Sequence, residues 1–299
     1  QHRIGPTHFE VGVFTNLTQD HLDYHKTMEN YYQAKRMMFD ECDDAIINMD
    51  DEYGKRLYDE IKCRKYTCGI GNTADFYADN ISIRADGTEF DYYYNGKSAH
   101  IVTQMIGMFN VFNVMAAISV CLKIGLEIND ILKALKEYKG VKGRCEIIPT
   151  GKDFTVICDY AHTPDAIENI LSSVKEYTSG DLICLFGCGG NRDSKKRPLM
   201  AKAAAKYADR LIITSDNPRD EIPEAIIDDI LAGLSDKEIP FDVVVDRTEA
   251  IYHSLKIAQK GDIIVLAGKG HEDYQVLSGN EHIHFDEREI VSEGLKLIN

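Results

Sequence analysis

The sequence predicts an α/β protein in which a mixed sheet with helices is followed by a Rossmann-like, doubly wound domain. Two observations lead to this fold class. In the second half of the chain, short apolar runs alternate with segments of helical period, which is typical of a parallel sheet covered by helices on both faces. In the first half, β-rich runs are separated by dipeptides that favour hairpin turns, which indicates antiparallel pairing.

The first half opens with a buried strand at Phe9–Leu17, which a polar, His-rich loop connects to a helix at residues 27–40. Between residues 76 and 104, three β-rich runs are separated by Asp86-Gly87 and Asn95-Gly96. Both dipeptides are strong hairpin signals, because their residues tolerate positive φ. Two further helices are expected, at residues 110–124 and 129–138.

The second half contains the apolar runs of the expected parallel sheet. They are Thr155–Cys158, Leu182–Phe186, Leu211–Thr214, Phe241–Val245 and Ile263–Ala267. Segments of helical period separate them, for example Ala166–Tyr177 and Leu199–Ala208. A glycine- and lysine-rich stretch at 139–143 reads as a linker, so we expect one domain at 1–143 and a second at 144–299. In such sheets ligands bind beyond the carboxyl ends of the strands. Chemistry is therefore expected in the polar segments Asp159–Asp165, Gly187–Arg197, Ser215–Asp220 and Gly268–Asp273.

Charge and cysteine content exclude some classes of function. A formal net charge of −15 argues against nucleic acid, whose phosphates require a basic surface. No apolar run has the length of a membrane span, and no signal peptide is visible. Eight cysteines without a C-x-x-C pair indicate a reducing, cytoplasmic compartment and no structural zinc. The chain opens at Gln1, within what reads as a folded segment, so we expect that the true amino terminus is missing.

Lys35 falls on the apolar stripe of the first predicted helix, beside Tyr31, Tyr32 and Phe39. A buried ammonium without a partner tends to lose its proton. The neutral amine can then react with carbon dioxide, and the resulting carbamate offers oxygen to Mg²⁺. The alternative is a lysine at the edge of the stripe, with its ammonium in water.

The loop before that helix carries two carboxylates and two imidazoles, at Asp20, His21, Asp23 and His25. Such a group at the end of a strand is suited to a metal or phosphate site. A solvated loop is the alternative.

Several runs, taken together and in order, resemble the Mur ligases over essentially the whole chain. In the first half they are T-N-L-T-Q-D-H-L-D-Y-H at 15–25, the segment around Lys35, and G-M-F-N-V-F-N at 107–113. In the second half they are Gly143-Arg144, D-Y-A-H-T-P at 159–164, G-C-G-G-N-R-D at 187–193, D-N-P-R at 216–219 and G-K-G-H-E at 268–272. Each run is weak alone, but their order is specific.

The resemblance implies that residues 1–143 are the carboxyl-terminal part of the family's central ATP-binding domain, and that 144–299 bind the amino-acid acceptor. It assigns Lys35, as a carbamate, and His21 to Mg²⁺. It assigns Gln1 and Arg3 to the UDP-muramoyl dipeptide, Asn110 and Asn113 to the adenine side of ATP, and Arg144, Asp159 and His162 to phosphate and ribose. From the residues alone, Asn110 and Asp159 could simply be helix N-caps.

The resemblance also implies a pocket for the acceptor, meso-diaminopimelate, which has an amino-acid centre at each end. The distal zwitterion needs a guanidinium for its carboxylate and an anion for its ammonium. Arg192 and Arg219 match the family's carboxylate-binding positions, and Asp216, Asn217, Glu272 and the backbone at Gly268 match its ammonium-binding positions. D-N-P-R, which includes Pro218, resembles the diaminopimelate-adding members. The alternative for Arg219 is a surface residue after a turn.

The implied activity is ATP-dependent addition of meso-diaminopimelate to UDP-N-acetylmuramoyl-L-alanyl-D-glutamate through an acyl phosphate, by a monomer, during synthesis of the peptidoglycan precursor. No G-x-x-x-x-G-K-[ST] phosphate loop occurs in these residues, so we expect the chain alone to be inactive. The alternatives are a lysine-adding homologue, a folylpolyglutamate synthetase-like ligase and a non-catalytic binding module. An NAD-dependent dehydrogenase is disfavoured, because Arg192 stands where the G-x-G-x-x-G fingerprint needs glycine.

Overall fold

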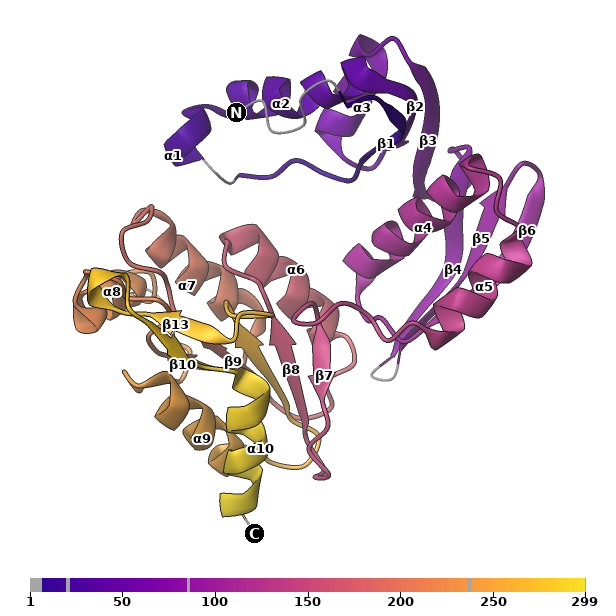
Figure 1. Ribbon diagram of the computed structural model, residues 1–299. Coiled ribbons are helices and arrows are strands. Elements are labelled where there is room, and N and C mark those ends of the chain that lie inside the picture. Colours follow the sequence, from indigo (N-terminus) through magenta and orange to yellow (C-terminus); the bar gives the residue numbers. More distant parts are fainter. Residues whose placement is uncertain (1–6, 20–21, 85–86, 236–237, 299) are drawn as a thin grey trace. The chain divides into compact units, whose positions relative to one another are not determined.

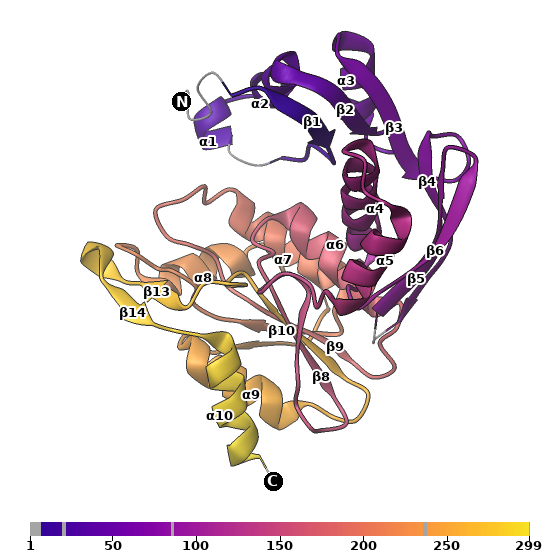
Figure 2. The same ribbon diagram turned by 45° about the vertical axis from the view of Figure 1, so that its right-hand side comes forward.

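The structure is a computed structural model that describes residues 7–19, 22–84, 87–235 and 238–298. The chain forms two compact units, residues 1–139 and residues 140–299. The division lies four residues before the expected boundary at 143/144. Each unit contains its own sheet and its own helices, as Figures 1 and 2 show. Gln1, Arg3 and His21, to which the resemblance assigns ligand-binding roles, lie outside the described residues.

The first unit contains a six-stranded mixed sheet with the strand order β1-β2-β3-β4-β5-β6. The strands are β1 Phe9–Phe14, β2 Cys42–Asn48, β3 Arg64–Ile70, β4 Phe76–Arg84, β5 Gly87–Tyr94 and β6 Lys97–Thr103. The first four are parallel, and β5 and β6 add antiparallel pairs. The mixed sheet confirms the predicted fold class. Asn95 and Gly96 both have positive φ in the β5–β6 turn, as the hairpin signal predicts.

Helices cover both faces of this sheet. Each face of the sheet has its own hydrophobic core cluster. The helices are α1 Leu22–His25, α2 Met28–Arg36, a 3₁₀ helix at Met37–Glu41, α3 Glu52–Glu60, α4 Met108–Lys123 and α5 Ile128–Glu137. The first predicted helix is therefore shorter than expected. Thr27 caps it, because its hydroxyl accepts a hydrogen bond from the N–H of Asn30, and the chain tightens into a 3₁₀ turn after Arg36.

The second unit contains a six-stranded sheet with the strand order β11-β10-β9-β12-β8-β7. The strands are β7 Glu146–Ile148, β8 Thr155–Asp159, β9 Leu182–Phe186, β10 Arg210–Ile213, β11 Phe241–Val243 and β12 Ile263–Ala267. Five are parallel, as predicted, and the short edge strand β7 pairs antiparallel with β8. Strands β8, β9 and β12 are buried almost throughout, which explains their continuous apolar sequences.

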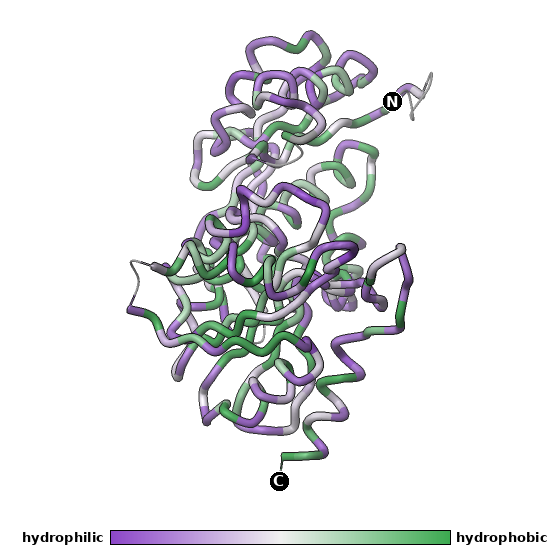
Figure 3. The backbone as a smooth tube through the Cα atoms, turned by 90° about the vertical axis from the view of Figure 1, so that its left-hand side faces the viewer, coloured by the Kyte–Doolittle hydropathy of each residue, from purple (hydrophilic) through white to green (hydrophobic). Residues whose placement is uncertain are grey.

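Five helices pack against this sheet. They are α6 Pro164–Lys175, α7 Lys196–Tyr207, α8 Pro223–Leu231, α9 Arg247–Ile257 and α10 Glu287–Leu297. In Figure 1, α6, α7 and α8 lie over one face, while α9 and α10 lie over the other. The α9–α10 face buries Val156, Leu185, Leu266 and their neighbours. The helix that ends at the C label in Figure 3 alternates between hydrophobic and hydrophilic residues, as a helix with one buried face should.

A small hairpin extends the second unit beyond β12. It consists of β13 Tyr274–Val276 and β14 His282–His284, with a 3₁₀ turn at Ser278–Asn280 between them. In the parts of the chain that the structure describes, no helix combines the length and apolar character needed to cross a bilayer. All eight cysteines are free.

Candidate functional site

Four loops of the second unit meet at one edge of its sheet. They follow the carboxyl ends of β8, β9, β10 and β12, where the sequence predicted chemistry. The register explains the convergence, because Ala267 at the end of β12 pairs with both Asp159 of β8 and Phe186 of β9. Phe186 in turn pairs with Ile213 at the end of β10. The strands thus end together, and the residues after them become neighbours.

Glycine is required where these loops come closest. A Cβ on Gly190 would overlap the carbonyl oxygen of Pro218, and the N–H of Gly190 donates to the carbonyl of Asn217 at 2.9 Å. Gly270 has φ +54°, and a Cβ there would lie 2.6 Å from Cβ of Tyr160 and 2.7 Å from the carbonyl oxygen of Gly143. Backbones therefore approach each other at distances that only glycine allows.

Lys269 lies at the centre of the site, with no exposed surface. Its Nζ lies 2.5 Å from Oδ1 of Asn217 and 2.8 Å from the carbonyl oxygen of Tyr274. The same nitrogen is 3.3 Å from a carboxylate oxygen of Asp216 and 3.3 Å from one of Glu272. One ammonium therefore joins the loop after β10 to the loop after β12.

Asp216, Asn217 and Glu272 are brought together as the sequence predicted. The side-chain amide of Asn217 donates to Glu272 at 3.1 Å, and its oxygen also accepts the N–H of Val276 at 2.9 Å. Asp216 is buried, and its Oδ1 has no hydrogen-bond partner beyond the ion pair with Lys269. The Asp216 backbone carbonyl accepts a hydrogen bond from Gln275 at 2.5 Å. The loop that holds these groups is thus rigidly supported.

Arg219 and Arg192 flank Gly189 at the same edge. Nη1 of Arg219 lies 3.0 Å from the position that a Cβ on Gly189 would take, and Cγ of Arg192 lies 3.7 Å from it. Arg219 is half-buried, adopts φ +51°, and donates to the carbonyl of Gly190 at 2.9 Å. It is therefore not the simple surface residue of the alternative interpretation. Arg192 is exposed, and buried Pro218 precedes Arg219 in the turn.

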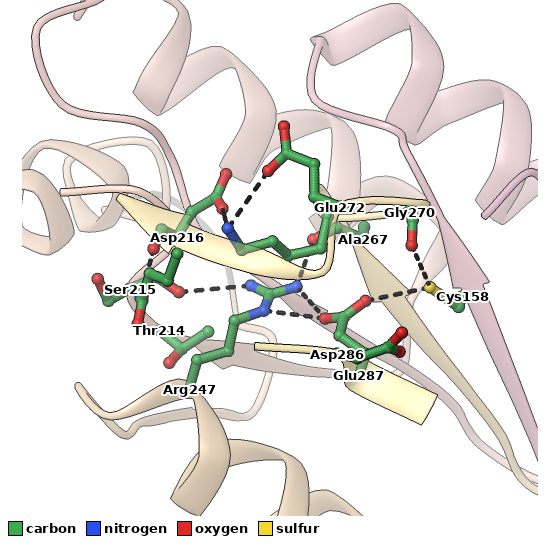
Figure 4. A network of polar contacts seen from close by, with 12 residues as sticks. Cys158, Thr214, Ser215, Asp216, Arg247, Ala267, Gly270, Glu272, Asp286 and Glu287 are labelled. Carbon is green, nitrogen blue, oxygen red and sulfur yellow. Dashed lines mark hydrogen bonds and ion pairs between the residues drawn. The ribbon is translucent and has the colours of Figure 1, made fainter. Parts of the chain in front are cut away.

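A buried ion pair supports these loops from beneath. The guanidinium of Arg247, at the start of α9, contacts Glu287, at the start of α10, at 2.7 Å, and neither side chain is exposed. Arg247 also donates to the carbonyls of Ala267 at 2.8 Å and Ser215 at 3.4 Å, at the ends of β12 and β10. Figure 4 shows Arg247 between Ser215, Ala267 and Glu287. Burial lowers the pKa of Arg247, but the charges of Glu287 and Asp216 and the hydrogen bonds to Glu287 together outweigh this effect and raise it.

The thiol of Cys158 completes this lower layer. It donates to Glu287 at 3.1 Å and lies 3.3 Å from the carbonyl of Gly270. Burial, followed by the neighbouring Glu287 charge, raises the pKa of the thiol well above its ordinary value. Cys158 is therefore a neutral donor that ties the G-K-G-H-E loop to the ion pair.

Asp159, Arg144 and His162 form a second group, at the end of β8. The guanidinium of Arg144 lies 4.6 Å from the ring centroid of Tyr160, which also packs against His162 at 4.7 Å and His271 at 5.0 Å. Asp159 accepts the N–H of Cys145 at 2.7 Å, and burial raises the pKa of its carboxyl group. The cap interpretation of Asp159 was wrong, because Thr163 caps α6.

Within the described residues, the candidates Lys35, Asn110 and Asn113 of the first unit lie on its helices. Asn110 is buried in the first turn of α4, where its amide donates to the carbonyl of Ile106 at 2.8 Å, while Gly107 occupies the N-cap position. The N-cap interpretation of Asn110 was therefore wrong, because the helix starts earlier than predicted. The amide of exposed Asn113 donates to Asn110 at 3.3 Å.

Lys35 lies in the last turn of α2 and is half-buried, while Tyr32 of the same stripe is fully buried. Its Nζ lies 5.3 Å from the ring centroid of Tyr31, which stacks on His25. Within the described ranges, no group of three or more His, Cys, Asp or Glu side chains could hold a metal ion. An unmodified ammonium cannot bind a cation, so Lys35 fits Mg²⁺ only as a carbamate.

Lys269, Arg247 and Glu287 were not predicted from the sequence as site residues. Lys269 had a visible signal, because it stands between two glycines and only Gly268 separates it from the apolar run Ile263–Ala267. A charged side chain in that position must turn inward beneath its own loop or outward into solvent. Arg247 and Glu287 had no such signal, since each begins an ordinary helix, and their pairing joins residues 40 positions apart.

Comparisons with known proteins agree with the motifs. Residues 1–121 match the Mur ligase middle domain, and residues 143–270 match the Mur ligase glutamate ligase domain. UDP-N-acetylmuramoyl-L-alanyl-D-glutamate–2,6-diaminopimelate ligase 1 of Clostridium acetobutylicum is 48% identical over 290 residues, which cover 96% of this chain and 60% of that protein. The ligase of that name from Bacillus cereus is 44% identical over 302 residues, which cover 98% and 61%. The chain thus spans about three fifths of the length of these curated relatives.

Solved structures show the same arrangement of elements. A structure of UDP-N-acetylmuramoyl-L-alanyl-D-glutamate–2,6-diaminopimelate ligase has 35% identity and a TM-score of 0.64, covering 96% of this chain and 60% of that one. The MurF ligase of Thermotoga maritima, solved in complex with ADP, has 14% identity and a TM-score of 0.72, covering 99% and 63%. The second likeness concerns the fold alone. From its motifs, its two domain matches and its relatives, the chain belongs to the Mur ligase family.

Proposed function

We propose that this chain is part of an ATP-dependent ligase that joins meso-diaminopimelate to UDP-N-acetylmuramoyl-L-alanyl-D-glutamate. One observation carries the proposal: Arg192 and Arg219 lie at the same sheet edge as Asp216, Asn217 and Glu272. The names of the relatives from Clostridium acetobutylicum and Bacillus cereus support this choice of substrates.

The proposed acceptor has two opposite charges at its distal end. Arg219 and Arg192 would pair with the distal carboxylate, because a guanidinium matches a carboxylate in charge and geometry. Asp216 and Glu272 would accept hydrogen bonds from the distal ammonium, Asn217 would orient Glu272 through its amide, and Pro218 and Gly268 would shape the backbone around it. L-lysine has the ammonium but not the distal carboxylate, so the two arginines provide the discrimination.

For the nucleotide, the proposal keeps the residues that the family resemblance assigns. Arg144 offers a guanidinium to phosphate, Asp159 and His162 belong to the same cluster at the end of β8, and Asn110 and Asn113 offer amides to adenine. Gln1 and Arg3 would hold the UDP-muramoyl dipeptide. Lys35, as a carbamate, and His21 would hold Mg²⁺, which neutralises phosphate charge when bound.

The proposed reaction has two steps. The D-glutamyl side-chain carboxylate attacks the γ-phosphorus of ATP, so that an acyl phosphate forms and ADP leaves. The acceptor amine then attacks the acyl carbon, loses a proton, and expels phosphate as the amide forms. The residues of this chain act mainly by holding the amine in place and by balancing charge. The use of ATP and of a UDP-linked substrate fits a cytoplasmic enzyme, and we expect a monomer.

The test is phosphate release from ATP by this chain joined to the amino-terminal two fifths of the Clostridium acetobutylicum relative. Release should require the UDP-linked dipeptide together with meso-diaminopimelate. Equal release with L-lysine would point to a lysine-adding ligase, and release with folate and glutamate to a folylpolyglutamate synthetase. No release with any acceptor, from a folded chain that still binds an amino acid, would indicate a binding module.

A further inference from the structure

Lys269 connects the loop after β10 with the loop after β12. It is fully buried, although an unpaired ammonium in that position would be costly. The structure gives it partners for all three N–H groups: the Asn217 amide oxygen, the Tyr274 carbonyl and a Glu272 carboxylate oxygen. The Asp216 carboxylate adds an ion pair at 3.3 Å. These partners include every side chain that the proposed function assigns to the acceptor ammonium.

The contacts of Lys269 determine how those side chains are presented. Because Lys269 and the N–H of Val276 occupy the Asn217 oxygen, the amide nitrogen of Asn217 must point toward Glu272. Asp216 has one buried oxygen directed at Lys269, and its other oxygen faces Gly268. Without the ammonium, Asp216 and Glu272 would lose the cation that they face, and Asn217 would keep only its hydrogen bonds with Val276 and Glu272.

The charges lead to the same conclusion. Asp216 and Glu272 carry two negative charges near one positive charge on Lys269, which leaves one negative charge uncompensated. In the layer below, Arg247 and Glu287 neutralise each other. One ammonium group from a ligand would therefore bring the summed charge of Lys269, Asp216, Glu272 and the ligand group to zero, whereas a neutral or anionic group would not.

We infer that Lys269 is a positioning residue that builds the ammonium half of the acceptor pocket, by holding Asp216, Asn217 and Glu272 in place. This inference rests on the proposed function, because it takes meso-diaminopimelate as the ligand. It assigns the two halves of the pocket to different residues. Arg192 and Arg219 serve the distal carboxylate, and Lys269 serves the distal ammonium through its three partners.

The test compares two ligands by calorimetric titration of the 299-residue chain. One ligand is meso-diaminopimelate. The other is (2S)-2-aminopimelate, which keeps both carboxylates and the attacking amine but lacks the distal ammonium. Lys269→Met should weaken binding of meso-diaminopimelate at least tenfold and binding of 2-aminopimelate less than threefold, so that the variant loses most of its preference. If Lys269 served only the general stability of the chain, Lys269→Met would weaken the binding of both ligands equally, and that outcome would overturn the inference.

Lys269→Gln is a second variant for the case in which Lys269→Met does not fold. Its glutamine amide keeps N–H donors for the Asn217 and Tyr274 oxygens. It should show the same selective loss, to a smaller extent, with an unchanged far-ultraviolet circular dichroism spectrum. If neither variant folds, Lys269 serves the fold alone and the inference is wrong. If the unaltered chain binds meso-diaminopimelate and both variants bind it equally well, the inference fails and the proposed function stands. If the folded, unaltered chain does not bind meso-diaminopimelate, the proposed acceptor itself is wrong.

Discussion

The two units place their candidate residues on different kinds of support. In the second unit the residues sit on loops at the ends of parallel strands, and two buried cations, Lys269 and Arg247, hold those loops from within. In the first unit Lys35 and Asn113 project from helices, and the Lys35 ammonium lies 5.3 Å from the ring centroid of Tyr31. The loops of the second unit are therefore held in place by contacts within the chain itself. Pre-organised charge of this kind lowers the cost of binding a charged ligand.

The largest expected effect comes from breaking the buried ion pair beneath the loops. Arg247→Met leaves the carboxylate of Glu287 buried without its guanidinium and leaves two carbonyl oxygens without a donor. The free energy of unfolding should fall by about 3–5 kcal/mol, measured by urea denaturation followed by circular dichroism.

The exposed pair Lys206–Glu168, on the same unit, provides the matched control. Lys206→Met should leave the urea midpoint unchanged, because water already solvates both charges. If Arg247→Met were as mild as this control, the second unit would not depend on its buried charges, and the contrast between the two units would disappear.

The next effect concerns the turn of the G-K-G-H-E loop. Gly270→Ala combines a positive φ with a Cβ that would press on Tyr160 and the carbonyl of Gly143. The strain of the left-handed conformation and the overpacking together should cost about 2–4 kcal/mol, again measured by urea denaturation.

Gly279→Ala separates the two contributions, because Gly279 also has a positive φ but no atom lies within 4 Å of its Cβ position. It should cost only about 1 kcal/mol. Equal losses in the two variants would show that conformation alone matters at Gly270, and that the close approach of the loops contributes nothing.

The smallest effect is a dependence on pH. Burial raises the pKa of Asp159 in the folded chain, so the folded state holds this proton more tightly than the unfolded state does. Stability from this group is therefore present at low pH and is lost as the pH rises through the folded pKa. Asp159→Asn removes that dependence, so the melting temperature of the variant, relative to that of the unaltered chain, should rise as the pH increases from 3 to 8. Exposed Asp153, changed to Asn, should show no such trend.

The sequence predicted the fold best where burial alone determines the residue pattern. Buried parallel strands read as apolar runs, so the central strands of the second unit and the loops after them could be predicted. Strands β2 and β3 were missed, although Ala45–Ile47 is fully buried, because charged residues at Asp43, Asp44, Arg64 and Lys65 interrupt their apolar pattern. The partners of Lys269 were also beyond prediction, since they depend on the inward turn between two glycines.

The central claim is that the loops after β9, β10 and β12 bind an amino-acid head group with a carboxylate and an ammonium. Calorimetric titration of the unaltered 299-residue chain with meso-diaminopimelate and with L-lysine tests it most directly. Meso-diaminopimelate should bind at least tenfold more tightly, and Arg219→Ala should reduce that preference to less than threefold. Equal affinity for the two amino acids in the unaltered chain would contradict the claim.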